Sequence, residues 1–159
     1  MSTVLSLLEK DATLSAKQIA VMLGTNEEDV KNQIKKYEEE KVILGYRTIV
    51  NWEGEEDEPV TAMIELKVTP QLGAGFDKVA QEIQQYEAVS SVYLMSGGFD
   101  ICVILEGKTM KEVALFVAEK LAPMEEVLST ATHFILKKYK IDGIITDNQK
   151  EDPREVITL

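Results

Sequence analysis

The first forty residues repeat a helical pattern of apolar positions, broken by residues that begin or end helices. A first helix is predicted from residue 4 to about Lys10. Ser15 and Gln18 have the spacing of a capping box, in which the hydroxyl and the amide satisfy exposed backbone N–H groups, so they begin a second helix. Gly24 supplies the backbone freedom with which that helix ends.

A third helix is predicted to begin after Asn26, which is a good N-cap. Glu27, Glu28 and Asp29 fill its first turn, where the helix dipole favours negative charge. Two helices joined by a short turn that contains glycine describe a helix-turn-helix. The β-rich residues 42–50 are expected to form the hairpin of a wing, so residues 1–51 are predicted to be a winged helix-turn-helix domain.

The pattern changes after an acidic segment, residues 52–59, that ends in proline and is predicted to be a linker. From there, apolar and β-branched runs alternate with amphipathic helical stretches. Strands are predicted at 60–68, 89–95, 100–106 and 127–139, and helices at 76–83 and from the capping box of Thr109 and Glu112 to Pro123. The order β-α-β-β-α-β predicts a ferredoxin-like domain over residues 60–143, and therefore an α+β protein. Residues 144–159 read as an extension with a short strand near its end.

Both faces of this predicted sheet are expected to be apolar. On the third strand, Ile101, Val103 and Leu105 alternate with Cys102 and Ile104. On the fourth strand, Leu128, Phe134 and Leu136 share a face with Thr130 and Thr132, and Ala131 and Ile135 lie opposite. Two helices can cover only one face, and the simplest cover for the other is the same face of a second copy. The sequence therefore predicts a homodimer.

Composition fits this architecture. The 159 residues are 45% hydrophobic and 28% charged, as in ordinary globular proteins. No apolar run approaches the roughly 18 residues of a membrane helix, and the N-terminus shows no secretory signal. With Cys102 as the only cysteine, a reducing, cytoplasmic setting without membrane association is expected.

The charge of the chain is unevenly distributed. The net charge of -11 argues by itself against a nucleic-acid partner. Residues 1–50, however, hold seven basic and eight acidic side chains, whereas residues 51–143 hold eight and sixteen. A local basic face on the N-terminal domain therefore remains compatible with the composition.

The outward face of the third predicted helix carries the candidate contacts to double-stranded DNA. Asn and Gln side chains can pair with adenine edges, and Lys can meet phosphate or guanine. The candidates are Lys31, Asn32, Gln33, Lys35 and Lys36, with Arg47 on the wing. The alternative is an ordinary solvated helix face.

Enzyme chemistry finds no support in the sequence. His133, the single histidine, alternates along a strand and reads as a packed or interface residue. No serine elbow, phosphate-binding loop or zinc-type spacing occurs, so no catalytic residue, cofactor or metal is expected.

The chain resembles the Lrp/AsnC family of bacterial and archaeal transcription regulators along nearly its whole length. The segments that carry the resemblance are Leu14-Ser15 with Ala20 and Leu23-Gly24, then 42–46, 96–100 and 130–132. The resemblance implies DNA binding by the first domain, and a second domain that binds a small effector, commonly an amino acid. It also implies dimers that assemble further, often into octamers of four dimers.

The positions that match the effector site of the family are Ser96, Gly97, Gly98, Asp100, Thr130 and Thr132. Paired glycines expose N–H groups that can hold a carboxylate, and Asp100 can pair with an α-ammonium group. The alternative is structural: the glycines make a tight hairpin, Asp100 caps it, and the threonines suit a strand.

One departure from the family keeps a second function open. The third predicted helix, which matches the recognition helix of the family, begins with three acidic residues and is less basic than is usual there. The chain is therefore either a DNA-binding transcriptional regulator tuned by an effector, or an oligomeric amino-acid-binding or interaction protein whose helix-turn-helix has lost DNA affinity.

Overall fold

The computed structural model describes residues 3–70 and 75–146. The chain divides into two compact units, one that ends at Val50 (unit one) and one that begins at Asn51 (unit two). Each unit is described by itself. In the described part of the chain, no helix has the length and hydrophobicity needed to cross a membrane.

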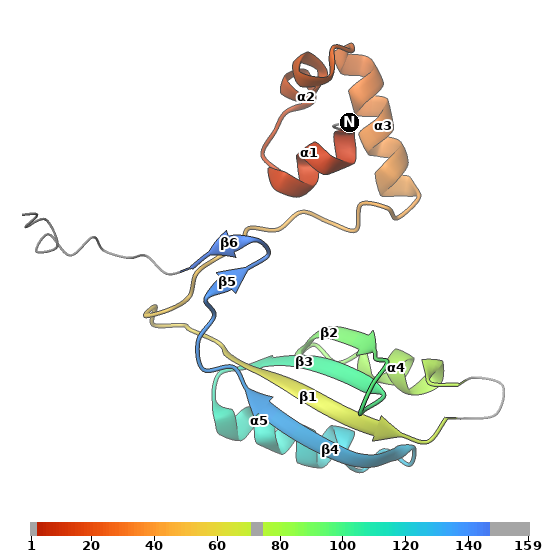
Figure 1. Cartoon of the computed structure of the whole chain (residues 1–159), viewed down its shortest axis with the longest axis vertical. Helices are drawn as coiled ribbons and strands as arrows, with labels where there is room; N and C mark the ends of the chain where they lie inside the picture. Colours follow the sequence, from red (N-terminus) through yellow and green to blue (C-terminus); the bar gives the residue numbers. More distant parts are fainter. Residues whose placement is uncertain (1–2, 71–74, 147–159) are drawn as a thin grey trace, which may run out of the picture. The chain divides into compact units, whose positions relative to one another are not determined.

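Unit one consists of α1 (Val4–Lys10), α2 (Ala16–Leu23) and α3 (Glu27–Glu39) (Figure 1). The predicted helix ends are confirmed. Ser15 and Gln18 form a complete capping box, Gly24 takes the left-handed conformation with φ of 67°, and the Asn26 side chain accepts a hydrogen bond from the Asp29 N–H at 2.8 Å. The three helices pack around a small buried core of Val4, Ile19, Ala20 and Val30.

The predicted wing is wrong for this chain. Residues 42–50 contain no strand and run as an extended segment. The Val42 and Ile43 N–H groups both donate to the Tyr37 carbonyl, which ties the start of the segment to the end of α3. A two-residue hairpin turn needs positive φ angles, and Gly45 does not have one. Although residues 42–50 are rich in β-forming residues, they therefore do not form a hairpin within unit one.

Unit two confirms the predicted α+β class. Its elements are β1 (Val60–Val68), α4 (Asp77–Ile83), β2 (Val89–Leu94), β3 (Ile101–Gly107), α5 (Met110–Phe116) and β4 (Val127–Phe134). The four strands form an antiparallel sheet in the order β2-β3-β1-β4 (Figure 1). After α5 the chain continues directly into a π-helical turn, Val117–Leu121, which the sequence did not predict.

The fourth strand is shorter than expected. It was predicted to reach residue 139 but ends at Phe134, and the Ile135 N–H then donates to the Thr61 carbonyl at the start of β1. Residues 140–145 form a separate small hairpin of β5 (Lys140–Ile141) and β6 (Ile144–Ile145). Asp142 and Gly143 make its turn with positive φ angles of 45° and 87°. The strand expected near the C-terminus lies outside the described residues.

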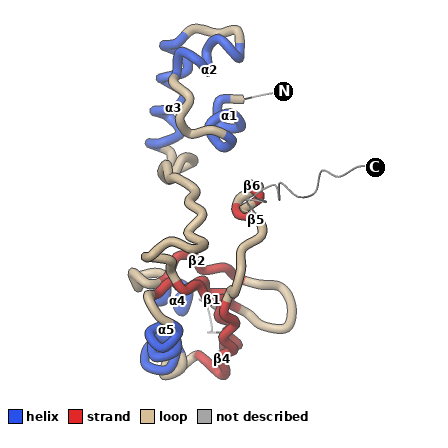
Figure 2. Tube along the Cα trace, turned by 90° about the vertical axis from the view of Figure 1, so that its left-hand side faces the viewer, coloured by secondary structure: helices blue, strands red, loops and turns tan. Residues whose placement is uncertain are grey.

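One face of the sheet forms the core of unit two. Both α4 and α5 lie on the same side of the sheet (Figure 2). Ala62, Ile64 and Leu66 of β1 are completely buried. Their partners across the ladder point to the same face: Leu105, Val103 and Ile101 on β3, and Phe134, Thr132 and Thr130 on β4. The helices contribute Val79, Ile83, Val113, Val117 and Leu121 to this core.

The opposite face, here called the open face, is only partly apolar, which corrects the expectation of two apolar faces. Its centre is apolar, with Met63, Cys102, Ile104 and the half-exposed Tyr93. Toward β4 it is polar, because the His133 Nε2 lies 3.3 Å from the Glu65 Oε1. The alternation of side chains along one strand shows which residues share a face, but not which residues of the next strand lie beside them. The pairing register between β1 and β4 was therefore needed to bring Glu65 and His133 together at this polar edge.

The central position of β1 predicts a large effect of truncating its core. Leu66→Ala should lower the free energy of unfolding by about 2–5 kcal/mol, because a fully buried leucine leaves a cavity. Leu136→Ala, at a side chain that is 84% exposed, is the matched control and should change stability by less than about 0.5 kcal/mol. Urea unfolding followed by circular dichroism measures both, and equal effects would contradict the assignment of the core.

Candidate DNA-binding helix and effector site

The outward face of α3 is defined by the side chains that pack inward. Val30 is buried, and Ile34 and Tyr37 pack against the same core. On the opposite side, Glu28, Asn32, Lys35 and Glu39 follow one another at helical spacing. Lys31 and Lys36 flank this stripe, and Gln33 lies beside Tyr37, nearer the packed side. The candidate DNA contacts are thus exposed on α3, with Gln33 the least outward of them.

Each candidate lysine of α3 lies close to a carboxylate one turn away. The Lys31 Nζ lies 2.8 Å from the Glu27 Oε1, and Lys35 and Lys36 lie 3.8 Å from Glu39 and Glu40. The hydrogen bond with Lys31 lowers the pKa of Glu27, and the same bond raises the pKa of Lys31. All three pairs are solvated, so a phosphate can replace the carboxylate of each. The lysines remain usable for DNA, but their charge is already partly compensated.

Arg47, the sixth candidate, is exposed on the extended segment after α3 and does not sit on a wing. Its neighbour Tyr46 donates a hydrogen bond from its hydroxyl to the Glu38 Oε1 at 3.0 Å. Burial, and secondarily this bond, raises the pKa of Tyr46. The contact attaches the segment that carries Arg47 to the C-terminal half of α3.

The turn between β2 and β3 is held to β1 by Asp100. One carboxylate oxygen of Asp100 accepts the Val68 N–H at 2.8 Å, and the Asp100 N–H donates to the Leu66 carbonyl at 2.9 Å. The Asp100 carbonyl accepts the Met95 N–H at 2.8 Å. The Asp100 side chain therefore binds β1 and does not cap its own turn, as the structural alternative had it, and through this bond it fixes the turn at the end of β1.

The register brings most of the candidate effector residues to this same end of the sheet. Leu66 lies between Ile101, which follows Asp100, and Thr130 on β4. Thr130 is half-buried, and Ser96, Gly97 and Gly98 are exposed in the turn. Thr132 lies two positions further along β4, opposite Ile64, and is exposed. The structure thus groups the turn with Thr130 and places Thr132 at the margin.

Exposed apolar side chains lie at this end of the sheet, and the sequence did not assign them to the effector site. Leu94 and Met95 precede the turn and are 63% and 41% exposed, and Leu128, at the irregular start of β4, is 70% exposed. The sequence could have indicated them, because each of these apolar residues stands next to a turn or at a strand end, where polar residues are more usual. A group with hydrogen-bonding N–H groups, a carboxylate and an apolar border can bind a small zwitterion that has an apolar side chain.

Within residues 3–70 and 75–146, no group of three or more His, Cys, Asp or Glu side chains could hold a metal ion. Cys102 is buried on the open face, and burial, followed by the charge of Glu65, raises its pKa.

A helical unit with a helix-turn-helix, joined to a ferredoxin-like unit with a candidate small-molecule site, is an architecture suited to a ligand-responsive transcriptional regulator. The sequence profile of the Lrp/AsnC ligand binding domain matches residues 61–145. The chain is 44% identical to the HTH-type transcriptional regulator YugG of Bacillus subtilis, over 98% of this chain and 94% of YugG. The chain therefore belongs to the Lrp/AsnC family: it is a DNA-binding transcriptional regulator with a ligand-binding domain, and not an enzyme.

Solved structures agree with this fold. A transcriptional regulator of Neisseria meningitidis in complex with L-Met superposes with a TM-score of 0.70 at 17% identity, over 89% of this chain and 91% of that one. The feast or famine regulatory protein of M. tuberculosis complexed with L-methionine gives a TM-score of 0.69 at 17% identity, over 87% and 91%.

The lysine–carboxylate pairs of α3 give a charge-neutralisation test. Lys35→Gln with Lys36→Gln should weaken binding to every duplex and reduce the slope of log affinity against log salt by about one per lysine. Glu39→Gln with Glu40→Gln should strengthen binding, because it removes the competing carboxylates. Fluorescence anisotropy with a labelled duplex from low to physiological salt measures both pairs. Unchanged affinity in the lysine pair would refute the assignment of α3.

Proposed function

We propose that this chain is a homodimeric transcriptional regulator whose assembly or DNA affinity is modulated by an amino acid bound at residues 96–100 and Thr130. The observation that carries the proposal is the grouping of the exposed glycine turn, Asp100 and Thr130 at one end of the sheet. The L-methionine complexes of two structural neighbours make an amino acid the ligand to test first.

The proposed binding mode assigns a role to each group. The N–H groups of Gly97 and Gly98 hold the carboxylate of the effector, and the second carboxylate oxygen of Asp100 meets its α-ammonium group. Thr130 adds a hydroxyl, with Thr132 beside it. Leu94, Met95 and Leu128 border an apolar side chain, which favours an effector such as methionine over a charged amino acid.

The proposed dimer buries the open face. At its apolar centre Tyr93 is 53% exposed in a single chain, whereas Met63 and Ile104 are half-buried and Cys102 is buried, and the Glu65–His133 pair lies at its polar edge. A second copy related by a two-fold axis would place the same residues opposite one another. An area of about 1,500 Å² or more would be typical of a stable dimer. Such a dimer carries two α3 helices, and four dimers would form the octamer that the family resemblance suggests.

The effector site can be tested at Gly98, where a side chain meets nothing. A Cβ at Gly98 has no neighbour within 4 Å, so Gly98→Ala should fold normally but intrude on the bound carboxylate. Titration calorimetry with L-methionine, then with the other amino acids, should show a dissociation constant raised about tenfold or more. Gly45→Ala, equally unhindered in the segment after α3, is the matched control. Unchanged binding in Gly98→Ala would exclude this turn as the site.

The dimer can be tested at Tyr93, which is 53% exposed on the open face. Tyr93→Glu should produce a folded monomer, because it places a charge in an apolar interface. Leu115→Glu, at a 45% exposed position on α5, should leave the assembly unchanged. Sedimentation velocity at low micromolar concentration distinguishes one, two and eight copies. A stable wild-type monomer would refute the dimer.

A further inference from the structure

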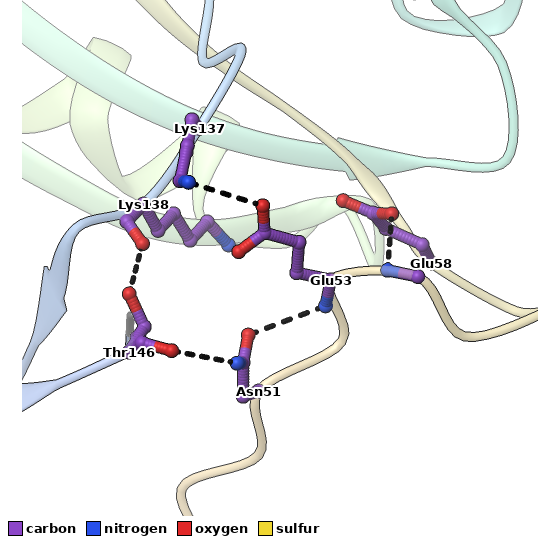
Figure 3. A network of polar contacts seen from close by, with 7 residues as sticks. Asn51, Glu53, Glu58, Lys137, Lys138 and Thr146 are labelled. Atoms are coloured by element: carbon purple, nitrogen blue, oxygen red, sulfur yellow. Dashed lines mark hydrogen bonds and ion pairs between the residues drawn. The ribbon is translucent and has the colours of Figure 1, made fainter. Parts of the chain in front are cut away.

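The acidic segment that enters unit two is bound to the segment that follows β4 (Figure 3). The Asn51 Nδ2 donates a hydrogen bond to the Thr146 carbonyl at 3.1 Å. The Lys137 Nζ lies 3.5 Å from the Glu53 Oε1. These contacts join parts of the chain that are far apart in sequence. We call the set Asn51, Glu53, Lys137, Lys138 and Thr146 the clasp.

Each side of the clasp is braced internally. On the linker side, the Asn51 Oδ1 accepts the Glu53 N–H at 3.2 Å, and the Glu58 Oε2 accepts the Gly54 N–H at 3.2 Å. On the other side, the Thr146 hydroxyl donates to the Lys138 carbonyl, and the Thr146 N–H donates to the Tyr139 carbonyl at 3.1 Å. Asn51 is the central residue of the clasp, because its side-chain amide donates to Thr146 on one side and accepts from the Glu53 N–H on the other.

The clasp is also attached to the sheet. The Lys138 Nζ donates a hydrogen bond to the Thr61 Oγ1 at 3.0 Å, and Thr61 is only 4% exposed at the start of β1. Thr146 is likewise buried, at 6% exposure. Through Thr146 and Lys138, the linker is therefore held at a fixed place relative to the core of unit two. Residues 51–58 of the linker are themselves exposed.

This attachment shortens the chain that connects the two units. The Ile43 N–H makes a backbone hydrogen bond to unit one, with the Tyr37 carbonyl at 3.0 Å, and we count the tether from this backbone attachment, leaving aside the exposed side-chain contact of Tyr46 with Glu38. Between Ile43 and Asn51 lie the seven residues 44–50, whereas sixteen residues, 44–59, would separate Ile43 from β1 if the clasp were open. At about 3.4 Å per residue, the maximum reach is about 24 Å with the clasp closed and about 54 Å with it open.

We propose that the clasp determines which spacing between two DNA half-sites this regulator accepts, with Asn51 and Glu53 as its specificity-determining residues. The proposal rests on the proposed dimer, since two helix-turn-helix units must act on one duplex. Half-sites read by such a pair are typically about 34–36 Å apart, one turn of DNA. A short tether restricts each unit to a narrow range of positions, whereas a long tether admits many.

The test compares two variants with the same change in charge. Asn51→Ala with Glu53→Gln removes both contacts across the clasp, and Glu55→Gln alters the same acidic segment without touching them. Both full-length variants are titrated against duplexes with two copies of a half-site, obtained by selection with the wild-type protein. The separation of the copies is increased base pair by base pair through two helical turns. A duplex with one half-site serves as the reference.

The wild type and Glu55→Gln should prefer one spacing per turn. In the double variant, affinity at that spacing should fall about threefold, because effective concentration decreases as roughly the −3/2 power of tether length. Its spacing profile should also broaden, with binding to the single half-site unchanged. A profile identical to that of the wild type overturns the proposal, and an equal loss on the single half-site shows a general effect on DNA binding and also overturns it.

A second measurement separates failure of the clasp from failure of the dimer. Hydrogen exchange of residues 51–58, followed by mass spectrometry, should be faster in the double variant than in Glu55→Gln, because the Glu53 N–H loses its acceptor. Equal exchange overturns the clasp even if the protein is a dimer. Faster exchange in a protein that sediments as a monomer refutes the dimer and the spacing role, and leaves only the clasp itself supported.

Discussion

Strand β1 is the constraint on which unit two depends. It is hydrogen-bonded to β3 on one side and to β4 on the other. Ala62, Ile64 and Leu66 have no exposed surface, so every helix and strand that encloses the core packs against this strand or its neighbours. Because side chains alternate with period two, a shift of one residue would expose all three and bury Met63, Glu65 and Lys67. The position of β1 therefore determines where both of its ends lie.

The two ends of β1 contact different sites of unit two. At the C-terminal end, Val68 is held by Asp100, which is part of the proposed effector site. At the N-terminal end, Thr61 contacts Lys138 of the clasp. A ligand changes a conformational equilibrium only if it binds two states with different affinity, and a strand buried this completely has little freedom to adopt a second state. If the proposed effector acts as suggested, this rigidity disfavours a signal passed along β1 to the linker and leaves contacts between copies at the exposed turn as the route.

The sequence was most informative where structure depends on near neighbours. Ser15 with Gln18, and Asn26 with Asp29, make their contacts three residues apart, so the ends of α2 and α3 could be predicted from local patterns. The same reasoning failed for residues 42–50, since β propensity does not supply a pairing partner. It could not find the bond from Asp100 to Val68, or that from Asn51 to Thr146, which join residues 32 and 95 positions apart. The effector candidates were nominated by family resemblance, and only the register grouped them.

The charges on α3 give a physical reason for the proposed assembly of this regulator. Its lysines already face Glu27, Glu39 and Glu40, so a phosphate that binds a lysine replaces an existing partner and gains little from local attraction. The gain that remains is the release of counterions from DNA, which is strongly reduced by salt. The displaced carboxylates stay on the same helix and repel the phosphates. For the proposed dimer, we expect one unit alone to be a weak DNA binder at physiological salt, and two units on one duplex to supply the affinity. Under that condition the length of the chain between the units affects binding as directly as the side chains of α3.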